Sequence, residues 1–200
     1  MLSLGNCRYA FIIVGLIGVL VFNVPSIMMF VHLPGGEKFS ELYVLGPGHM
    51  AEGYPSNVGA GVDYSVFLGV GNHLGGSAYY EVVVKMRNAT EPLSNATSGV
   101  PSPLPMLYAY EVFLAEGRTW EEALVFRFDD VAFGVNVSAV GRIRVNGAWA
   151  NVNETAVWDD VNSGYYYQVF VELWLYNAPS NSFGFNNRFV SLWLNMTSSM

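Results

Sequence analysis

The sequence contains little cysteine and little charge. Its 200 residues include one cysteine, Cys7, so the chain forms no internal disulfide and no multi-cysteine metal site. Charged residues make up 12% of the chain, about half the usual share. Nine Lys and Arg against sixteen Asp and Glu give a net charge of -7, which leaves little positive surface for a phosphate backbone. This composition argues against a nucleic-acid partner and favours a membrane-attached, strand-rich protein.

The sequence also lacks the short motifs that mark common catalytic and cofactor sites. It has no G-x-G-x-x-G that leads into a helix, no G-x-x-x-x-G-K-[ST], no G-x-S-x-G and no H-E-x-x-H. The three histidines, His32, His49 and His73, are scattered near turns and in a linker. We therefore predict no catalytic residue, no cofactor and no metal site.

Two acidic pairs are the remaining candidates for chemistry, Asp129-Asp130 and Asp159-Asp160. Asp160, Asn162 and Gly164 have a spacing that offers oxygens to Ca²⁺, but the closing glutamate of such a loop is missing. A turn is the favoured interpretation of this stretch.

The start of the chain is a long apolar run. Residues 9–36 contain no Asp, Glu, Lys or Arg, and residues 10–31 are long enough, at about 1.5 Å per residue, to span a bilayer as a helix. Pro25 predicts a kink in this helix. A cleaved signal peptide is the alternative, but no small-x-small cleavage site follows. Cys7 precedes the run, whereas a lipoprotein cysteine follows one, so acylation and simple burial both stay open.

The charges and the glycosylation motifs predict the same orientation. Arg8 lies before the apolar run, which places residues 1–9 in the cytoplasm, residues 32–40 in a linker and residues 41–200 outside the cell. Four of the five threonines occupy the third position of an Asn-x-Ser/Thr sequon. This bias predicts N-glycosylation, and the candidate sites are Asn88, Asn95, Asn136, Asn153 and Asn195.

The outer region has the alternating pattern of β-strands. We expect strands at residues 63–72, 77–86, 106–114, 124–128, 140–145, 165–176 and 188–196, and a strand that ends at Leu45. Asn146-Gly147 predicts a hairpin, and residues 90–105, with four prolines, predict an exposed loop. Residues 119–124 are expected to form at most one helical turn.

About seven short strands without helices predict an all-β fold. An immunoglobulin-like antiparallel β-sandwich that follows one N-terminal transmembrane helix fits this pattern, without the disulfide of antibody domains. Trp120, Trp174 and Trp193 are the candidates for its core.

Three ordered blocks resemble a family of archaeal membrane-anchored proteins that carry a domain of unknown function. The first runs from Phe39 to His73 and contains "LGPG", "AEGYP" and Asn72-His73; the second is "FLAEGRTWEEALVFRF", and the third is "NRFVSLWLNMT". The resemblance implies a surface protein with a β-sandwich outer domain, and it implies no activity. The sequence departs from the family at Gly71, at Leu74 and in an Asn-rich region at 146–162, which weakens any functional role for Asn72-His73.

These observations predict a single-pass cell-membrane protein whose outer domain serves recognition, adhesion or envelope organisation without catalysis. The lipid bilayer is one partner, and other envelope proteins or glycans are candidates. Residues 177–187 are expected to form either an ordinary hairpin loop or a loop that supplies such contacts. One alternative is a homo-oligomer or filament subunit that assembles by pairing of an edge strand such as 189–195. Another is an envelope carbohydrate-active enzyme or its accessory module, which requires convergent carboxylates or a nucleophile with its base.

Overall fold

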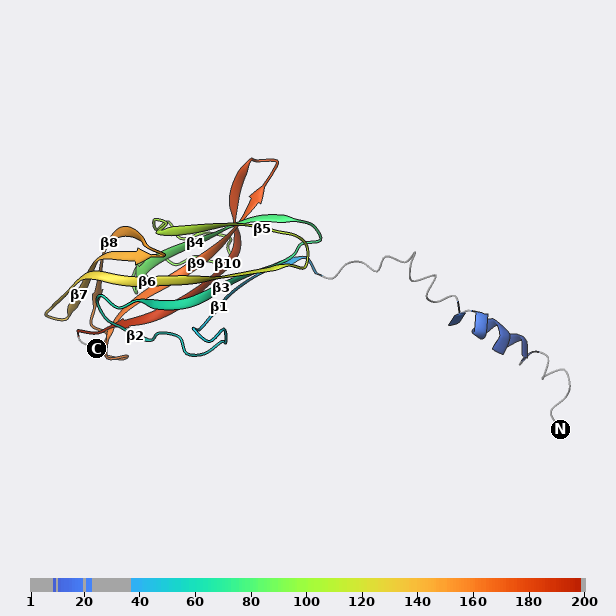
Figure 1. Cartoon of the computed structure of the whole chain (residues 1–200), viewed down its shortest axis with the longest axis horizontal. Coiled ribbons are helices and arrows are strands. Elements are labelled where there is room, and N and C mark those ends of the chain that lie inside the picture. The colour runs from blue at the N-terminus through green and yellow to red at the C-terminus, as the bar shows by residue number, and fades with distance from the viewer. Residues whose placement is uncertain (1–8, 10, 20, 23–36, 199–200) are drawn as a thin grey trace, which may run out of the picture. The chain divides into compact units, whose positions relative to one another are not determined.

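The computed structural model describes residues 9, 11–19, 21–22 and 37–198 (Figure 1). The chain divides into two compact units, one up to Glu37 and one from Lys38. Residues 9, 11–19 and 21–22 are helical, and their side chains are apolar and exposed. Among the described residues no helix is both long and apolar enough to cross a membrane. Residues 10, 20 and 23–31 of the predicted transmembrane segment lie outside the described part of the chain, as does His32.

The second unit consists of two five-stranded sheets. The first has the order β1-β3-β6-β7-β8, with β1 (Phe39–Leu45), β3 (Tyr64–His73), β6 (Thr119–Gly134), β7 (Val137–Val145) and β8 (Ala148–Val157). The second has the order β2-β10-β9-β4-β5, with β2 (Asn57–Val58), β10 (Ser182–Met196), β9 (Tyr165–Asn177), β4 (Ala78–Asn88) and β5 (Tyr108–Leu114). All neighbouring strands are antiparallel except β10 and β2. The predicted all-β antiparallel sandwich is confirmed.

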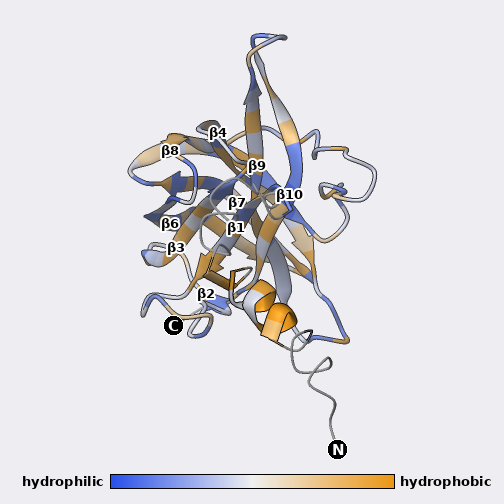
Figure 2. Cartoon of the chain, turned by 90° about the vertical axis from the view of Figure 1, so that its right-hand side faces the viewer, coloured by the Kyte–Doolittle hydropathy of each residue, from blue (hydrophilic) through white to orange (hydrophobic). Residues whose placement is uncertain are grey.

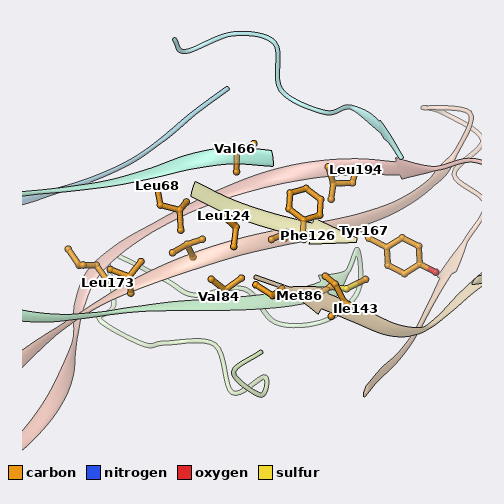
Figure 3. Close-up of a cluster of buried hydrophobic side chains, with 14 of the residues drawn as sticks. Val66, Leu68, Val84, Met86, Leu124, Phe126, Ile143, Tyr167, Leu173 and Leu194 are labelled. Carbon is orange, nitrogen blue, oxygen red and sulfur yellow. The ribbon is translucent and has the colours of Figure 1, made fainter. Parts of the chain in front are cut away.

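The core lies between the two sheets because alternate residues of each strand point inward. β3 contributes Val66 and Leu68, β6 contributes Leu124 and Phe126, and other strands add further fully buried side chains (Figure 3). Figure 2 shows the resulting mixture of apolar and polar residues along single strands. Each buried Leu, Val or Phe side chain stabilises the fold by about 1.5–3 kcal/mol. This packing holds the sandwich together. The single cysteine of the chain, Cys7, lies outside the described residues.

The seven predicted strands each correspond to an observed one, but several are longer. Residues 119–124, predicted as a helical turn, are the first part of β6, which pairs with β3 at Thr119 through Phe126. Intrinsic propensity is a weak signal in so short a stretch, and pairing with a buried strand overrides it. β1 begins at Phe39, two residues before the predicted start of the outer domain.

The tryptophan predictions were right for one residue of three. Trp120 packs against the core, whereas Trp174 and Trp193 lie on the outer face of the second sheet, and Trp193 is 45% exposed. Strand parity decides this outcome: Leu192, Leu194 and Met196 point into the core, so Trp193 points out.

The connection between β4 and β5 covers part of the outer face of the second sheet. Most of residues 90–105 are exposed, as predicted, but Ser94 and Ser102 are buried. Both donate hydrogen bonds to Oε1 of Glu172, which also forms a buried ion pair of 2.9 Å with Nζ of Lys85. Nζ of Lys85 donates to the carbonyl of Ser102 at 2.7 Å. The loop is therefore fixed to the sheet by a buried polar network.

Candidate functional site

Two aromatic residues form a platform at one end of the outer face of the second sheet. Tyr166 in β9 is paired with Asn195, and Trp193 in β10 is paired with Gln168. Since Trp193 and Asn195 are two positions apart, their side chains share a face, and Tyr166 and Trp193 are diagonal neighbours on it. Their rings leave an apolar surface open to solvent, because Trp193 remains 45% exposed.

Trp193 is held in position by a buried cation on the same face of the sheet. The guanidinium of Arg87 lies 5.3 Å from the centre of the Trp193 ring. Arg87 itself donates to Oε1 of Gln168 and to the carbonyl of Glu91, and Gln168 donates to Oγ of Ser191 at 2.8 Å. Burial lowers the pKa of Arg87, but the guanidinium remains charged at neutral pH. The ring is therefore fixed before any ligand arrives.

A tight turn supplies the polar wall beside this platform. Asp159 and Gly164 exchange backbone hydrogen bonds, and Oδ1 of Asp159 accepts the backbone N–H groups of Val161 and Asn162 at 2.9 and 3.1 Å. Asn162 donates through Nδ2 to Oδ2 of Asp159 at 2.7 Å, and the hydroxyl of Tyr166 donates to the Asn162 carbonyl at 2.8 Å. The hydrogen bonds from Asn162 lower the pKa of Asp159, so its carboxylate stays ionised.

The platform and the turn enclose a hollow of about 480 Å³. It is lined by Ala89, Asp159, Asn162, Tyr166 and Trp193. A second hollow of about 180 Å³ shares Ala89, Asp159 and Tyr166 with it and continues toward Asn88 and Thr155. The larger volume is within the range of small-molecule sites, about 300–1,000 Å³. We refer to the larger hollow as the platform hollow.

The chemistry of the platform hollow is that of binding. Its lining contains no Ser, Cys, Lys or His. Asp159 offers hydrogen-bond acceptors, the Asn162 side chain offers an acceptor oxygen, and the two rings offer apolar faces. The one negative charge in the lining disfavours anionic ligands.

A pair of carboxyl groups lies beside Asn88, which lines the smaller hollow. Asn88 donates through Nδ2 to Oε2 of Glu154 at 3.1 Å and through its backbone N–H to Glu91 at 2.9 Å. Burial, followed by the nearby Glu91 carboxyl, raises the pKa of Glu154 to about 7. The Glu154 carboxyl therefore holds its proton more tightly than an ordinary glutamate does.

Comparison with known proteins identifies a family. The family described as a domain of unknown function, DUF1616, matches residues 33–137, which are 105 of the 200 residues. The chain belongs to the DUF1616 family. The matched segment of this DUF1616 protein contains β1 to β6. The platform hollow, apart from Ala89, lies in the part of the chain beyond the match.

Solved structures give weak likenesses to the DUF1616 protein. Two are structures of a β-glucosidase from Listeria innocua, one in complex with gluconolactone (TM-score 0.36, 11% identity) and one with glucose (TM-score 0.36, 10% identity). They cover 82% and 80% of this chain, which spans only 17% and 16% of theirs. No curated protein matches the sequence.

The structure divides the predicted glycosylation sites into two groups. Asn95, Asn136 and Asn153 are exposed. Asn88 and Asn195 are half-buried with Nδ2 already donating, to Glu154 and to Oδ1 of Asn57 respectively. The side chain of Asn195 also occupies the space where a Cβ on Gly164 would lie.

Among the described residues, His49, His73 and the acidic pairs lie apart from the lining of the platform hollow, except for Asp159. His49 is bonded to Glu121 and stacks on Phe67, while His73 stacks on Phe39. Asp129 and Asp130 form ion pairs with Arg127 and Arg142. Among the described residues no group of three His, Cys, Asp or Glu lies close enough to hold a metal ion.

Another hollow, of about 620 Å³, lies between β5 and β6 beside Tyr108, Tyr110 and Trp120. Its polar groups cap the first part of β6, which has no partner on the β7 side because the pairing with β7 begins at Phe126. The hydroxyl of Tyr110 donates to the Ala123 carbonyl at 2.8 Å, Asn146 bonds both backbone groups of Val125, and burial raises the pKa of Tyr110 to about 12. We interpret this arrangement as protection of a strand edge.

The size of Trp193 predicted a place in the core, and no sequence motif indicated the platform hollow. The alternation of Leu192, Trp193 and Leu194 contained the signal that Trp193 points outward. Trp193 lies beside residues 159–166 because β9 pairs with β10. The sequence alone did not specify this pairing.

Proposed function

We propose that this protein is a membrane-anchored recognition module of an archaeal cell envelope that binds neutral glycans without catalysis. Residues 10–31 serve as the transmembrane helix, residues 1–9 lie in the cytoplasm, and the sandwich faces outward. Support comes from the apolar run, from Arg8 on its N-terminal side and from the five sequons of the outer region.

We also propose that the sandwich is immunoglobulin-like. Its first sheet begins with β1, β3 and β6, and its second sheet places β10, β9 and β4 side by side; the two-residue β2 is not counted in this comparison. These orders correspond to the A-B-E and G-F-C arrangements of that fold. β5 then extends the second sheet, and the β7–β8 hairpin is an addition that extends the first.

The exposed, braced ring of Trp193 is the observation that carries the proposed binding function. A large aromatic side chain that points away from the core gains less from burial than one inside it, yet Arg87 and its partners fix this one. Rigid aromatic rings bind at a low cost in conformational entropy. The arrangement is suited to a ligand that presents a flat, partly apolar face.

A neutral sugar matches the rest of the lining. The C–H face of a pyranose packs on an aromatic ring, while its hydroxyl groups donate to acceptors such as the Asp159 carboxylate and the Asn162 amide oxygen. A phosphorylated or sulfated ligand brings negative charge toward Asp159. With few contacts in an open hollow, we expect a dissociation constant on the order of 1 mM for a short oligosaccharide.

The ligand class is tested with the full-length chain in detergent micelles. We would record saturation-transfer NMR spectra with neutral oligosaccharides of glucose, mannose, galactose and N-acetylhexosamines, and with sulfated and uronic-acid oligosaccharides. We expect transfer to at least one neutral series, and loss of it in Trp193→Ala. Transfer to the anionic series alone, or to none, would contradict the proposal.

Strand pairing between copies is supported by the free edges of the sandwich. The predicted edge at residues 189–195 is partly closed, because Asn195 and Met196 pair with β2. β1, β5 and β8 each have one neighbour. Sedimentation of the same sample distinguishes a monomer per micelle from a filament.

A further inference from the structure

Two turns at one end of the sandwich form an exposed apolar surface. One is the β6–β7 turn at residues 133–137, and the other connects β8 to β9 at residues 157–164. Their exposed apolar side chains are Phe133 (39%), Val135 (94%), Val157 (74%), Trp158 (39%) and Val161 (90%). We call these five side chains the apolar tip. Contiguous exposed apolar surface promotes association and usually has a binding partner or a cover.

The two turns are one structural unit. The backbone N–H of Trp158 donates to the carbonyl of Asn136 at 3.0 Å. Tyr165 lies between the rings of Phe133 and Trp158, with centroid distances of 5.7 and 5.1 Å. Whatever covers one turn therefore also lies beside the other.

The apolar tip and the start of β1 lie at opposite ends of the sandwich. Phe39 is paired with His73 and Gly71 with Thr119, so β1 starts beside the start of β6. The 16 residues of β6 then extend over about 50 Å, at about 3.3 Å per residue, to the tip. Figure 1 shows β7 and β8 at the end away from the blue start of β1.

An N-glycosylation sequon occupies the centre of the tip. Asn136 follows Val135 directly, and Ser138 completes the motif. Asn136 is exposed, its φ of 56° places it in the left-handed region of a turn, and it lies three residues after the ring of Phe133. Because Phe133 and Asn136 belong to the same short turn, a sugar attached at Nδ2 can pack its C–H face on the ring of Phe133.

We propose that Asn136 carries an N-linked saccharide that packs on Phe133 and Trp158 and covers the apolar tip. In the reaction, Nδ2 attacks C1 of a lipid-linked phosphosaccharide. The bond between C1 and the phosphate oxygen breaks, the phosphate leaves with the lipid, and the amide loses one proton. This inference rests on the outward-facing orientation of the proposed function, and it is independent of sugar binding in the platform hollow.

The fold also indicates when the transfer takes place. Ser138, the hydroxyl residue of this sequon, is fully buried, and its Oγ lies 2.9 Å from the hydroxyl of Tyr167. A transferase that must contact this hydroxyl reaches it only before β7 has docked. We therefore expect modification during or before folding, and we expect Ser138→Ala to disturb the core.

The charges of the tip argue against a lipid surface as its cover. Residues 133–138 and 157–164 contain no Lys or Arg and two acidic residues, Asp159 and Asp160. Surfaces that bind anionic membranes combine apolar side chains with Lys and Arg. An attached neutral saccharide covers the apolar side chains without this repulsion.

The first test is glycopeptide mass spectrometry on the full-length protein from its native membranes. We expect a saccharide on the peptide that contains Asn136. Modification of Asn95 or Asn153 with an unmodified Asn136 would overturn this inference and leave the proposed orientation intact. A complete lack of saccharide would overturn both, whereas oligosaccharide binding by the platform hollow would still be measurable.

The packing is tested by a double-mutant cycle. Thermal unfolding is measured for the wild type, Phe133→Ala, Asn136→Gln and the double variant, with Asn95→Gln as the matched control for loss of a saccharide elsewhere. We expect Phe133→Ala to lower Tm by about 2–4 °C more in the glycosylated background than in the Asn136→Gln background. Equal shifts in both backgrounds would show that the saccharide does not pack on Phe133.

Discussion

Tyr80 in β4 donates a buried hydrogen bond of 3.2 Å to Oδ1 of Asn72 in β3, and so connects the two sheets of the sandwich. Asn72 is fully buried, and its Nδ2 donates to the carbonyls of Gly76 at 2.8 Å and Leu114 at 3.0 Å. Ser40 of β1 completes the network through the Tyr80 hydroxyl at 2.9 Å. The Asn-His pair of the sequence therefore contributes a structural crosslink through its asparagine.

Replacement of Asn72 by alanine leaves several buried groups without partners. We expect Asn72→Ala to reduce the free energy of unfolding by about 2–4 kcal/mol, since each unsatisfied buried polar group costs about 1–3 kcal/mol. Urea denaturation measures this loss. Asn151→Ala, at an exposed position of β8, is the control and should change stability by less than about 0.5 kcal/mol. Equal effects of the two substitutions would refute the crosslink.

The buried pair of Lys85 and Glu172 should behave as a coupled unit. Removing one partner leaves an uncompensated buried charge, so Lys85→Met alone is expected to cost about 3–5 kcal/mol. The double variant Lys85→Met, Glu172→Met should be more stable than Lys85→Met. Hydrogen exchange of residues 90–105 should increase in the single variant, because it loses the hydrogen bond from Nζ of Lys85 to the carbonyl of Ser102. Additive losses in the double variant would contradict this account.

Gly69 in β3 is required by the ring of Tyr43, its neighbour in β1. A Cβ at position 69 would lie 2.0 Å from Cζ of Tyr43, so Gly69→Ala must displace the ring and should cost about 1–3 kcal/mol. Gly184→Ala is the matched control, since no atom lies within 4 Å of the added Cβ there. In a Tyr43→Ala background, Gly69→Ala should lower the free energy of unfolding only slightly. An undiminished loss there would show that the added Cβ clashes with a group other than the Tyr43 ring.

Glu154 should make stability depend on pH near neutrality. Its pKa is about 7 in the folded state and 4.5 ordinarily, so the folded protein binds this proton more tightly than the unfolded chain does. The stabilisation is fully present below about pH 4.5 and is lost as the pH rises through about 7. Relative to Glu154→Gln, the wild type should lose about 1 kcal/mol between pH 5 and pH 8, after allowance for solvent screening. Denaturation at both pH values measures this difference.

The control for this prediction is Glu52→Gln, at an exposed position. It should show the same pH dependence as the wild type. If the free energy of unfolding changed with pH equally in the wild type and in Glu154→Gln, the folded protein would not bind the Glu154 proton more tightly than the unfolded chain does.

The sequence predicted strands where alternation was regular and missed features that depend on partners far along the chain. Residues 63–72 and 165–176 were predicted as strands because apolar side chains recur along them, and they correspond to β3 and β9. By contrast, the strand character of residues 119–124 comes from pairing with β3, and the burial of Ser94 comes from Glu172, 78 residues away. Trp193 illustrates both limits: its size suggested the core, its parity indicated the surface, and only sheet pairing places it beside Asp159 and Tyr166.

The central claim is that the exposed ring of Trp193 binds a neutral sugar, and an equilibrium titration of three full-length proteins tests it most directly. The wild type, Trp193→Ala and Trp149→Ala are each titrated with the neutral oligosaccharide that gives the strongest saturation transfer. Trp149 is a matched control, because it is 49% exposed and lies within 5.6 Å of two arginine guanidinium groups, on β8 and outside the platform hollow. We predict at least about tenfold weaker binding for Trp193→Ala, equivalent to about 1.4 kcal/mol, and unchanged binding for Trp149→Ala. Equal affinity of the wild type and Trp193→Ala would contradict the claim.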